Sequence, residues 1–116
     1  MVNAQDDKGQ TALCFACDQV TEQRRIVEAL LEAEANVSLC HTQTLSTPLH
    51  IACARQHVLV VDMLLWQNAN INARDHLDLT PLHLAVSQAV LTIVTSLIER
   101  GAEPNARDVN GDTPLH

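Results

Sequence analysis

The sequence predicts a mainly α-helical protein made of stacked repeats of one helix–turn–helix unit. The segment TPLH occurs at residues 47–50, 80–83 and 113–116, so successive copies lie 33 residues apart. A weaker copy, TALC, begins at Thr11. Self-similarity at a period of this length indicates an array of units, in which neighbours bury each other's apolar faces.

The helical part of one unit, which begins at Thr80, shows why two helices are expected. Threonine is a good N-cap, and Pro81 suits the first helical position because its missing N–H would have no helical partner there. A second stretch with helical apolar spacing begins at Ile93, and Gly101 closes it as a C-terminal cap. The polar stretch that follows must reverse the chain and present the next Thr-Pro pair.

These residues resemble the ankyrin repeat family, whose T-P-L-H-x-A signature and period of about 33 residues match this chain along its whole length. The resemblance implies units in which two helices follow a β-hairpin connector, and stacked units that form a curved solenoid. It also implies a scaffold without catalytic activity. Such a scaffold binds another protein through its hairpin tips and through the concave face of its first helices.

The repeat register predicts a single domain over residues 1–116. Its units are expected at about 6–38, 41–74 and 75–107, and a fourth begins at 108–116. Neither end resembles a capping unit with a polar outer face, which repeat arrays need at their ends. The chain is therefore expected to be a piece of a longer array.

Two of the units depart from the family at glycine positions. The glycine usual in the hairpin is replaced near Leu45 and by Asp78, and the glycine usual between the helices is replaced by Gln56 and Ala89. Glycine is favoured there because other residues are strained at positive φ. The middle units are therefore expected to be less ideal than a consensus unit.

Composition and charge narrow the class of partner. With 47% hydrophobic and 18% charged residues the chain is globular in composition, and it has neither a membrane-spanning run nor the apolar segment of a secretory signal. The net charge of −7 argues against nucleic acid, because duplex binding depends on neutralising phosphates with Lys and Arg. A basic or extended peptide segment of another protein is favoured, and the domain is expected to be a monomer.

Cysteine and histidine spacing raises the alternative of a zinc site. Cys14 and Cys17 form a CxxC, and His50 with Cys53 forms an HxxC at the corresponding place in the next unit. Packed helices lie roughly 8–10 Å apart, whereas two thiolates on one zinc are about 4 Å apart. We therefore expect no metal and no cofactor. The resemblance implies instead that the histidine of TPLH hydrogen-bonds its threonine and a neighbouring unit.

The cysteines bear on the cellular location of the protein, and the catalytic motifs bear on enzyme activity. The four cysteines are expected to be free thiols, which favours a reducing compartment, the cytoplasm or the nucleus. The sequence has neither G-x-S-x-G nor H-E-x-x-H, and no glycine-rich phosphate loop with a lysine. No catalytic residue is therefore predicted, and no enzyme activity is expected.

Candidate partner-binding residues are the positions that the repeat leaves variable. They are Arg74, His76, Leu77, Leu79, Arg107, Val109, Asn110 and Asp112 in the connectors, and Arg55, Ser87 and Gln88 on the first helices. The apolar connector residues indicate either an exposed interaction patch or packing between adjacent hairpins. Trp66 is expected either to be exposed at the end of a second helix or to lie flat over its own unit.

A second functional hypothesis is a regulatory or substrate segment of a larger enzyme or channel. Asn105, with Glu103 two residues before it and Leu97 eight before it, resembles the pattern at which asparaginyl hydroxylases modify ankyrin repeats. Asn105 is therefore a candidate modification site. The alternative is that this asparagine only hydrogen-bonds the connector.

Overall fold

The computed structural model describes residues 3–5, 11–18, 24–38 and 44–114. Its helices are α1 (Ala12–Asp18), α2 (Arg24–Glu32), α3 (Pro48–Ala54), α4 (Val58–Trp66), α5 (Pro81–Ser87) and α6 (Leu91–Glu99). The described residues contain helices and turns but no strand, so the mainly α class is confirmed. Cys40 and the last two residues of the third TPLH copy lie outside this part of the chain.

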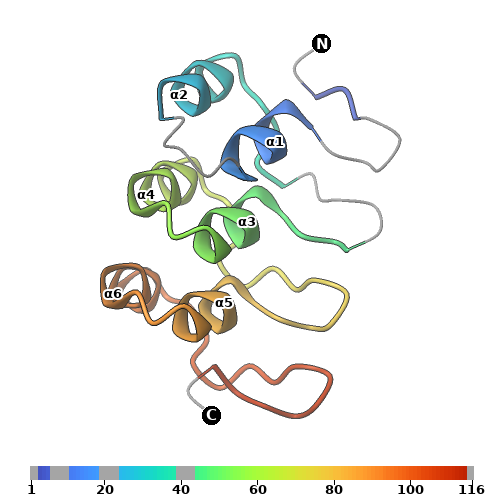
Figure 1. Ribbon diagram of the computed structural model, residues 1–116, viewed down its shortest axis with the longest axis vertical. Coiled ribbons are helices and arrows are strands. Elements are labelled where there is room, and N and C mark those ends of the chain that lie inside the picture. Colours follow the sequence, from blue (N-terminus) through green and yellow to red (C-terminus); the bar gives the residue numbers. More distant parts are fainter. Residues whose placement is uncertain (1–2, 6–10, 19–23, 39–43, 115–116) are drawn as a thin grey trace.

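The helices form three pairs that stack in a column (Figure 1). The first helices, α1, α3 and α5, contact one another in order, and so do the second helices, α2, α4 and α6. The connectors project on the side of the first helices, and the second helices form the opposite side (Figure 1). Stacking of equivalent helices follows from the repeat, whereas the β-hairpin form of the connectors and a wider solenoid stay predictions.

The two complete TPLH segments begin helices as predicted. Thr47 lies in extended conformation before α3, and its Oγ1 accepts a hydrogen bond from the backbone N–H of His50 at 3.3 Å. Thr80 caps α5 in the same way, with a distance of 3.4 Å to the N–H of His83. Because proline follows each threonine, the first helical position needs no hydrogen-bond partner for an N–H group.

A continuous apolar core runs through the stack. Leu49 and Leu82 of the first helices and Leu64 and Leu97 of the second helices have no exposed surface. The neighbouring first helices come close because Ala85 and its equivalents are small and buried. Burying an apolar side chain of this size stabilises the fold by about 1.5–3 kcal/mol. The core therefore holds each pair to the next and leaves the connectors and outer helix faces available for other contacts.

The turns in which another residue replaces the usual glycine have the positive φ that was predicted for them. Leu45, Gln56, Asp78 and Ala89 have φ angles of 57°, 64°, 59° and 56°. An L-residue in this left-handed region is strained by roughly 1–2 kcal/mol, because Cβ approaches the following carbonyl oxygen. The equivalent connector turn of the last unit has Gly111, at a φ of 80°, and is free of this strain.

Ala89→Gly is expected to stabilise the protein. Relief of about 1–2 kcal/mol of strain exceeds the backbone entropy cost of about 0.5–1 kcal/mol for glycine. The free energy of unfolding, measured by urea titration, should therefore rise by about 0.5–1 kcal/mol. The matched control is Ala29→Gly at an exposed position inside α2, where the same change should cost about 1 kcal/mol. A lower unfolding midpoint for Ala89→Gly would show that the backbone at Ala89 is not strained.

Candidate functional site

The histidines of TPLH connect each first helix to the following connector. His50 Nδ1 lies 2.9 Å from Thr47 Oγ1 and accepts the backbone N–H of Thr47 at 3.2 Å. On the other side of the ring, Nε2 lies 2.8 Å from the carbonyl oxygen of Leu79. Because Nδ1 accepts and a carbonyl can only accept, the proton must be on Nε2. His50 is therefore a neutral ring with both nitrogens engaged.

His83 repeats this arrangement one unit further along. Its Nδ1 lies 2.8 Å from Thr80 Oγ1, and its Nε2 lies 3.0 Å from the carbonyl oxygen of Asp112. Both rings thus bridge their own N-cap and the next connector, which confirms the role that the family resemblance implied. The ring nitrogens are occupied by structural contacts, so these histidines hold the following connectors in position.

Burial lowers the pKa of His50, and the hydrogen bond to the Leu79 carbonyl opposes this shift only in part. The cause is desolvation, because a buried imidazolium loses its hydration. The neutral ring that the geometry requires is therefore also the form that burial favours.

The lowered pKa predicts that the protein loses stability in mild acid. The unfolded His50 takes up a proton near pH 6.5, whereas the folded ring resists protonation. The contribution is fully present above pH 6.5 and declines as the pH falls through it, by at most about 1.4 kcal/mol per pH unit. Urea unfolding at pH 7.5 and 5.5 measures this. His76→Gln, at an exposed position, should keep the decline; equal stability at both pH values would contradict the prediction.

Asp75 organises the connector that precedes α5. Its side chain is 8% exposed, and Oδ1 accepts the backbone N–H groups of Leu77 and Leu79, both at 2.9 Å. Asp108 does the same for Asn110 and Asp112, at 2.8 and 3.0 Å. These aspartates were not among the predicted site residues. The repeated segment NARD, which ends at both of them, was the sequence signal that could have identified them.

Adjacent connectors are joined to one another at their tips. The backbone N–H of His76 donates to Thr44 O at 2.9 Å, and that of Val109 donates to Leu77 O at 3.0 Å. Arg74 Nη1 donates to the carbonyl oxygen of Arg107 at 2.8 Å. The connector residues predicted to bind a partner therefore form one connected row along the stack.

The exposure of the apolar connector residues separates them into two kinds. Leu77 and Val109 are 43% and 56% exposed, and the hydrogen bond between their backbones places them at neighbouring tips. Leu79 is half-buried, and its carbonyl oxygen accepts from His50 Nε2. Leu77 and Val109 can thus offer an apolar contact to a partner. The partial burial of Leu79 fits the alternative, which is packing between adjacent connectors.

A hollow lies between the connectors and the first helices. Its volume is about 390 Å³, and it extends over α3 and α5 beside the buried face of His50. Its lining includes Ser46, Ile51, Ala54, Arg55, Leu84 and Gln88. Gln56 Nε2 donates to Gln88 Oε1 at 2.9 Å, which joins the ends of α3 and α5. The structure therefore brings Arg55 and Gln88 together in one hollow.

The remaining predicted residues lie around this hollow and on the last connector. Ser87 is exposed at the end of α5, and its hydroxyl donates to Leu84 O at 2.8 Å. Arg107 and Asn110 are exposed, whereas Asp112 is half-buried. Asn105 is exposed, and its backbone N–H donates to Glu103 Oε1 at 2.8 Å. Modification of Asn105 stays a prediction.

The three cysteines that the structure describes lie in the core. Cys14, Cys17 and Cys53 are buried and form no disulfide. Desolvation raises the pKa of the Cys53 thiol to about 12. Since the thiolate is the form that binds metals and reacts, this thiol is unreactive at neutral pH. Within the ranges that the structure describes, no three His, Cys, Asp or Glu side chains converge as metal ligands.

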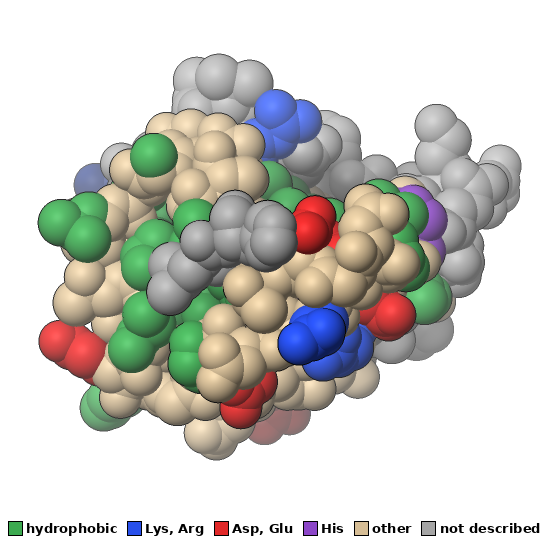
Figure 2. All heavy atoms as spheres, turned by 90° about the horizontal axis from the view of Figure 1, so that it is seen from below, with side chains coloured by type: hydrophobic (Ala, Val, Ile, Leu, Met, Phe, Trp, Pro, Cys, Tyr) green, Lys and Arg blue, Asp and Glu red, His purple; other side chains and the backbone are tan. Residues whose placement is uncertain are grey.

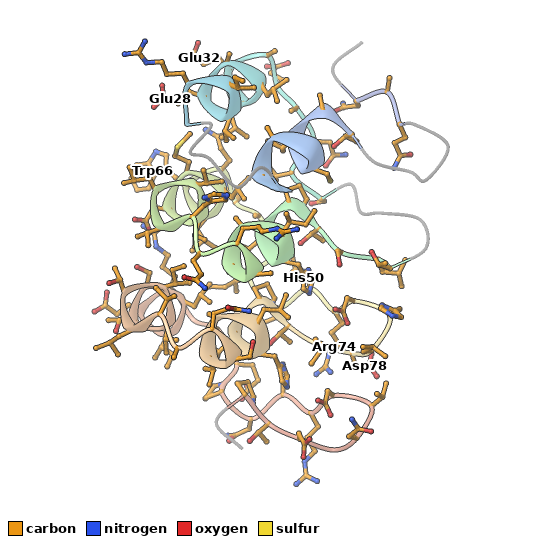
Figure 3. All side chains as sticks on the ribbon, in the orientation of Figure 1. Glu28, Glu32, His50, Trp66, Arg74 and Asp78 are labelled. Carbon is orange, nitrogen blue, oxygen red and sulfur yellow. The ribbon has the colours of Figure 1, made fainter. Side chains whose placement is uncertain are left out.

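Further exposed apolar side chains lie on the second helices α4 and α6. Trp66 is 78% exposed at the end of α4, which settles the sequence alternatives in favour of exposure (Figure 3). Seen from the α6 end, hydrophobic side chains gather on the lower face of the stack (Figure 2). Leu91 and Ile98 of α6 are 76% and 44% exposed. None of the described helices is both long and apolar enough to cross a bilayer.

The three stacked helix pairs define a helical repeat protein, and in two of them the first helix has a Thr-Pro start and a histidine that bridges to the next connector. A family model for ankyrin repeats (3 copies) matches residues 1–75, and a second for ankyrin repeats (many copies) matches residues 66–116. The chain belongs to the ankyrin repeat family. Ankyrin repeats are in general modules for protein–protein interaction, and domains built from them are typically non-catalytic.

Proposed function

We propose that this domain is a non-catalytic scaffold that binds an extended peptide segment of another protein across the connectors and first helices. The hollow that contains Arg55 and Gln88 is the observation that carries this proposal. Both side chains are exposed, and both can hydrogen-bond the backbone of an extended segment. The row of tips extends the same surface from one unit to the next.

The connectors support this role because they are already ordered. Asp75 and Asp108 each accept two backbone N–H groups, and neighbouring tips hydrogen-bond one another. A surface that is ordered before binding loses less conformational entropy when a partner arrives. Leu77 and Val109 would then act as apolar anchors beside polar contacts from Arg74 and Asn110.

The proposal includes the cellular location, the class of partner and the oligomeric state of the domain. Buried, reduced cysteines fit a cytoplasmic or nuclear location, where disulfides are rare. The net charge of −7 disfavours nucleic acid as a partner. We further propose that the domain acts as a monomer in a solenoid whose connectors are hairpins. Its units would be 6–38, 41–74 and 75–107.

Leu77→Ala combined with Val109→Ala is expected to weaken partner binding by about 1–3 kcal/mol, because a few apolar anchors dominate most interfaces. Both side chains are substantially exposed, so the stability of the domain should change by only about 0.5 kcal/mol. The measurement is calorimetric titration of a partner recovered by affinity capture, with urea unfolding in parallel.

The control for this experiment is Glu99→Ala, an exposed position on α6 at the opposite side of the stack. It should leave affinity unchanged. Normal binding by the double variant would place the interface elsewhere. A loss of several kcal/mol in stability would instead show that the two side chains pack against each other as structural residues.

A further inference from the structure

The connector that follows α6 contains an asparagine directly before a glycine, Asn110 and Gly111. This connector lies at the lower end of the stack (Figure 1), and both residues are exposed. The backbone N–H of Gly111 donates to the carbonyl oxygen of Asp108 at 2.9 Å, which closes a turn. A Cβ placed on Gly111 would meet none of the described atoms within 4 Å, its chain neighbours aside. The turn is therefore fixed in shape and open to water on this side.

This pair of residues can react without a catalyst. The backbone nitrogen of Gly111 attacks the side-chain carbonyl carbon of Asn110, and the new C–N bond closes a five-membered succinimide ring. The side-chain nitrogen leaves as ammonia and takes the proton that the Gly111 nitrogen loses. The two groups are held close by the chain itself, which favours the attack, and glycine has no Cβ to crowd the nitrogen.

Water then opens the ring at one of its two carbonyl carbons. Opening at the side-chain carbonyl gives aspartate. Opening at the main-chain carbonyl gives isoaspartate, in which the backbone runs through the former Cβ and is one atom longer. Water is the only other reactant, so the whole sequence needs neither an oxidant nor a cofactor.

The rest of the chain provides internal comparisons for Asn110. The other asparagines precede alanine, valine or isoleucine, whose side chains hinder the attack. The equivalent turn of the preceding connector has Leu77 and Asp78, so no side-chain amide is present at that place. That turn is closed by the same hydrogen bond, from the Asp78 N–H to the Asp75 carbonyl oxygen at 2.9 Å. The stack thus contains an unreactive copy of the same turn.

We propose that Asn110 is a site of spontaneous deamidation, and that the isoaspartate formed there releases the bridge between His83 and the last connector. Asp108 Oδ1 accepts the backbone N–H groups of Asn110 and Asp112, at 2.8 and 3.0 Å. Isoaspartate places an additional backbone atom between these two groups, so one oxygen can no longer hold both. This inference concerns the connector itself and does not depend on the function proposed above.

The displacement of Asp112 extends the effect to α5. The carbonyl oxygen of Asp112 lies 3.0 Å from His83 Nε2 and also accepts the backbone N–H of Asp108 at 2.9 Å. The new carboxylate at position 110 also joins those of Asp108 and Asp112, and like charges at close range repel. The loss of ammonia is not reversed, so the modification acts as a one-way release of this connector.

Incubation of the intact chain in neutral buffer at body temperature tests the reaction. Mass spectrometry of proteolytic fragments should show replacement of the amide nitrogen by oxygen at Asn110, and chromatography should separate isoaspartate as the main product. The reference is a free peptide of residues 107–113. Because the turn is exposed, the rate at Asn110 in the folded chain should lie within about tenfold of the rate in the peptide.

Two variants test the chemistry of the pair. Asn110→Gln keeps the amide but lengthens the side chain, so cyclisation should slow by about tenfold or more. Gly111→Asp copies the preceding connector, where Asp78 adopts a φ of 59° in the equivalent turn. It should keep the turn and also slow the reaction by about tenfold or more, since a Cβ now crowds the nitrogen.

A third variant separates the longer backbone from the added charge. Freshly prepared Asn110→Asp carries the carboxylate on a backbone of normal length. Amide hydrogen exchange of Asp112 should accelerate by about tenfold or more in the isoaspartate form, because the N–H is no longer held by Asp108. In Asn110→Asp it should change by no more than about twofold.

Each measurement can overturn the proposal. A folded chain that stays intact while the peptide reacts would show that the turn protects Asn110. Equal rates for Gly111→Asp and the unaltered chain would show that the glycine does not determine the reaction. Aspartate as the main product, or unchanged exchange of Asp112 in the isoaspartate form, would exclude release of the His83 bridge. The same acceleration in Asn110→Asp would assign the effect to charge alone.

Discussion

His50→Ala is expected to lower the free energy of unfolding by about 3–5 kcal/mol, a large share of the stability of a small domain. The imidazole is fully buried, so its removal leaves a cavity. The Thr47 N–H loses its acceptor, and the Leu79 carbonyl loses one of its two donors. The substitution therefore combines a packing loss with a buried polar group that has no partner.

Urea unfolding of the variant beside His76→Ala tests this expectation. His76 also contacts the neighbouring connector, since its Nδ1 lies 3.0 Å from Thr44 O, but it is exposed. Water can replace this hydrogen bond, so the control should lose only about 1 kcal/mol or less. Equal losses in the two variants would show that burial and N-capping at His50 contribute little.

Asp75→Ala should destabilise the domain by about 2–4 kcal/mol, since hydrogen bonds to a charged acceptor contribute about 1.5–3 kcal/mol each. Alanine leaves the N–H groups of Leu77 and Leu79 without the oxygen that holds them at 2.9 Å. The connector then loses the contact that defines its shape. Partner binding should weaken as well, because Leu77 would no longer be held at the tip.

Asp75→Asn separates hydrogen bonding from charge. Its amide keeps an oxygen in the position of Oδ1 and can still accept both N–H groups, so it should recover most of the lost stability. Thermal unfolding and amide hydrogen exchange of Leu77 and Leu79 give the comparison. If the asparagine variant were as unstable as the alanine variant, the negative charge itself, and not the acceptor geometry, would hold the connector.

The sequence alone was sufficient for features that depend on backbone geometry repeated in each unit. The period of TPLH predicted the stack, and threonine before proline predicted where α3 and α5 begin. The left-handed turns at Gln56 and Ala89 were predicted for the same reason, because each occupies a place where the family uses glycine. The helix starts and the turns are local, so one unit contains all the information they need, whereas the stack follows from comparing the units.

Contacts inside a connector, and most side-chain contacts between units, were harder to predict. The fork of hydrogen bonds at Asp75 depends on how tightly the connector turns, which composition does not reveal. The exposure of Trp66 depends on the lengths of side chains from two helices. A pairing such as Arg100 with Asp62 becomes visible only when the neighbouring helices are placed side by side.

The histidine bridges give the stack a direction. His50 reaches forward to the connector before α5, and His83 reaches forward to the connector after α6, so each unit depends on the one that follows it. Opening a later unit deprives the preceding histidine of its acceptor, whereas opening an earlier unit leaves the later helix cap intact. In the first unit Cys14, a single sulfur atom, stands where the two ring nitrogens would be. Among the described helix pairs, α1 and α2 should therefore open more readily than α3 and α4, whose histidine is held by the next connector.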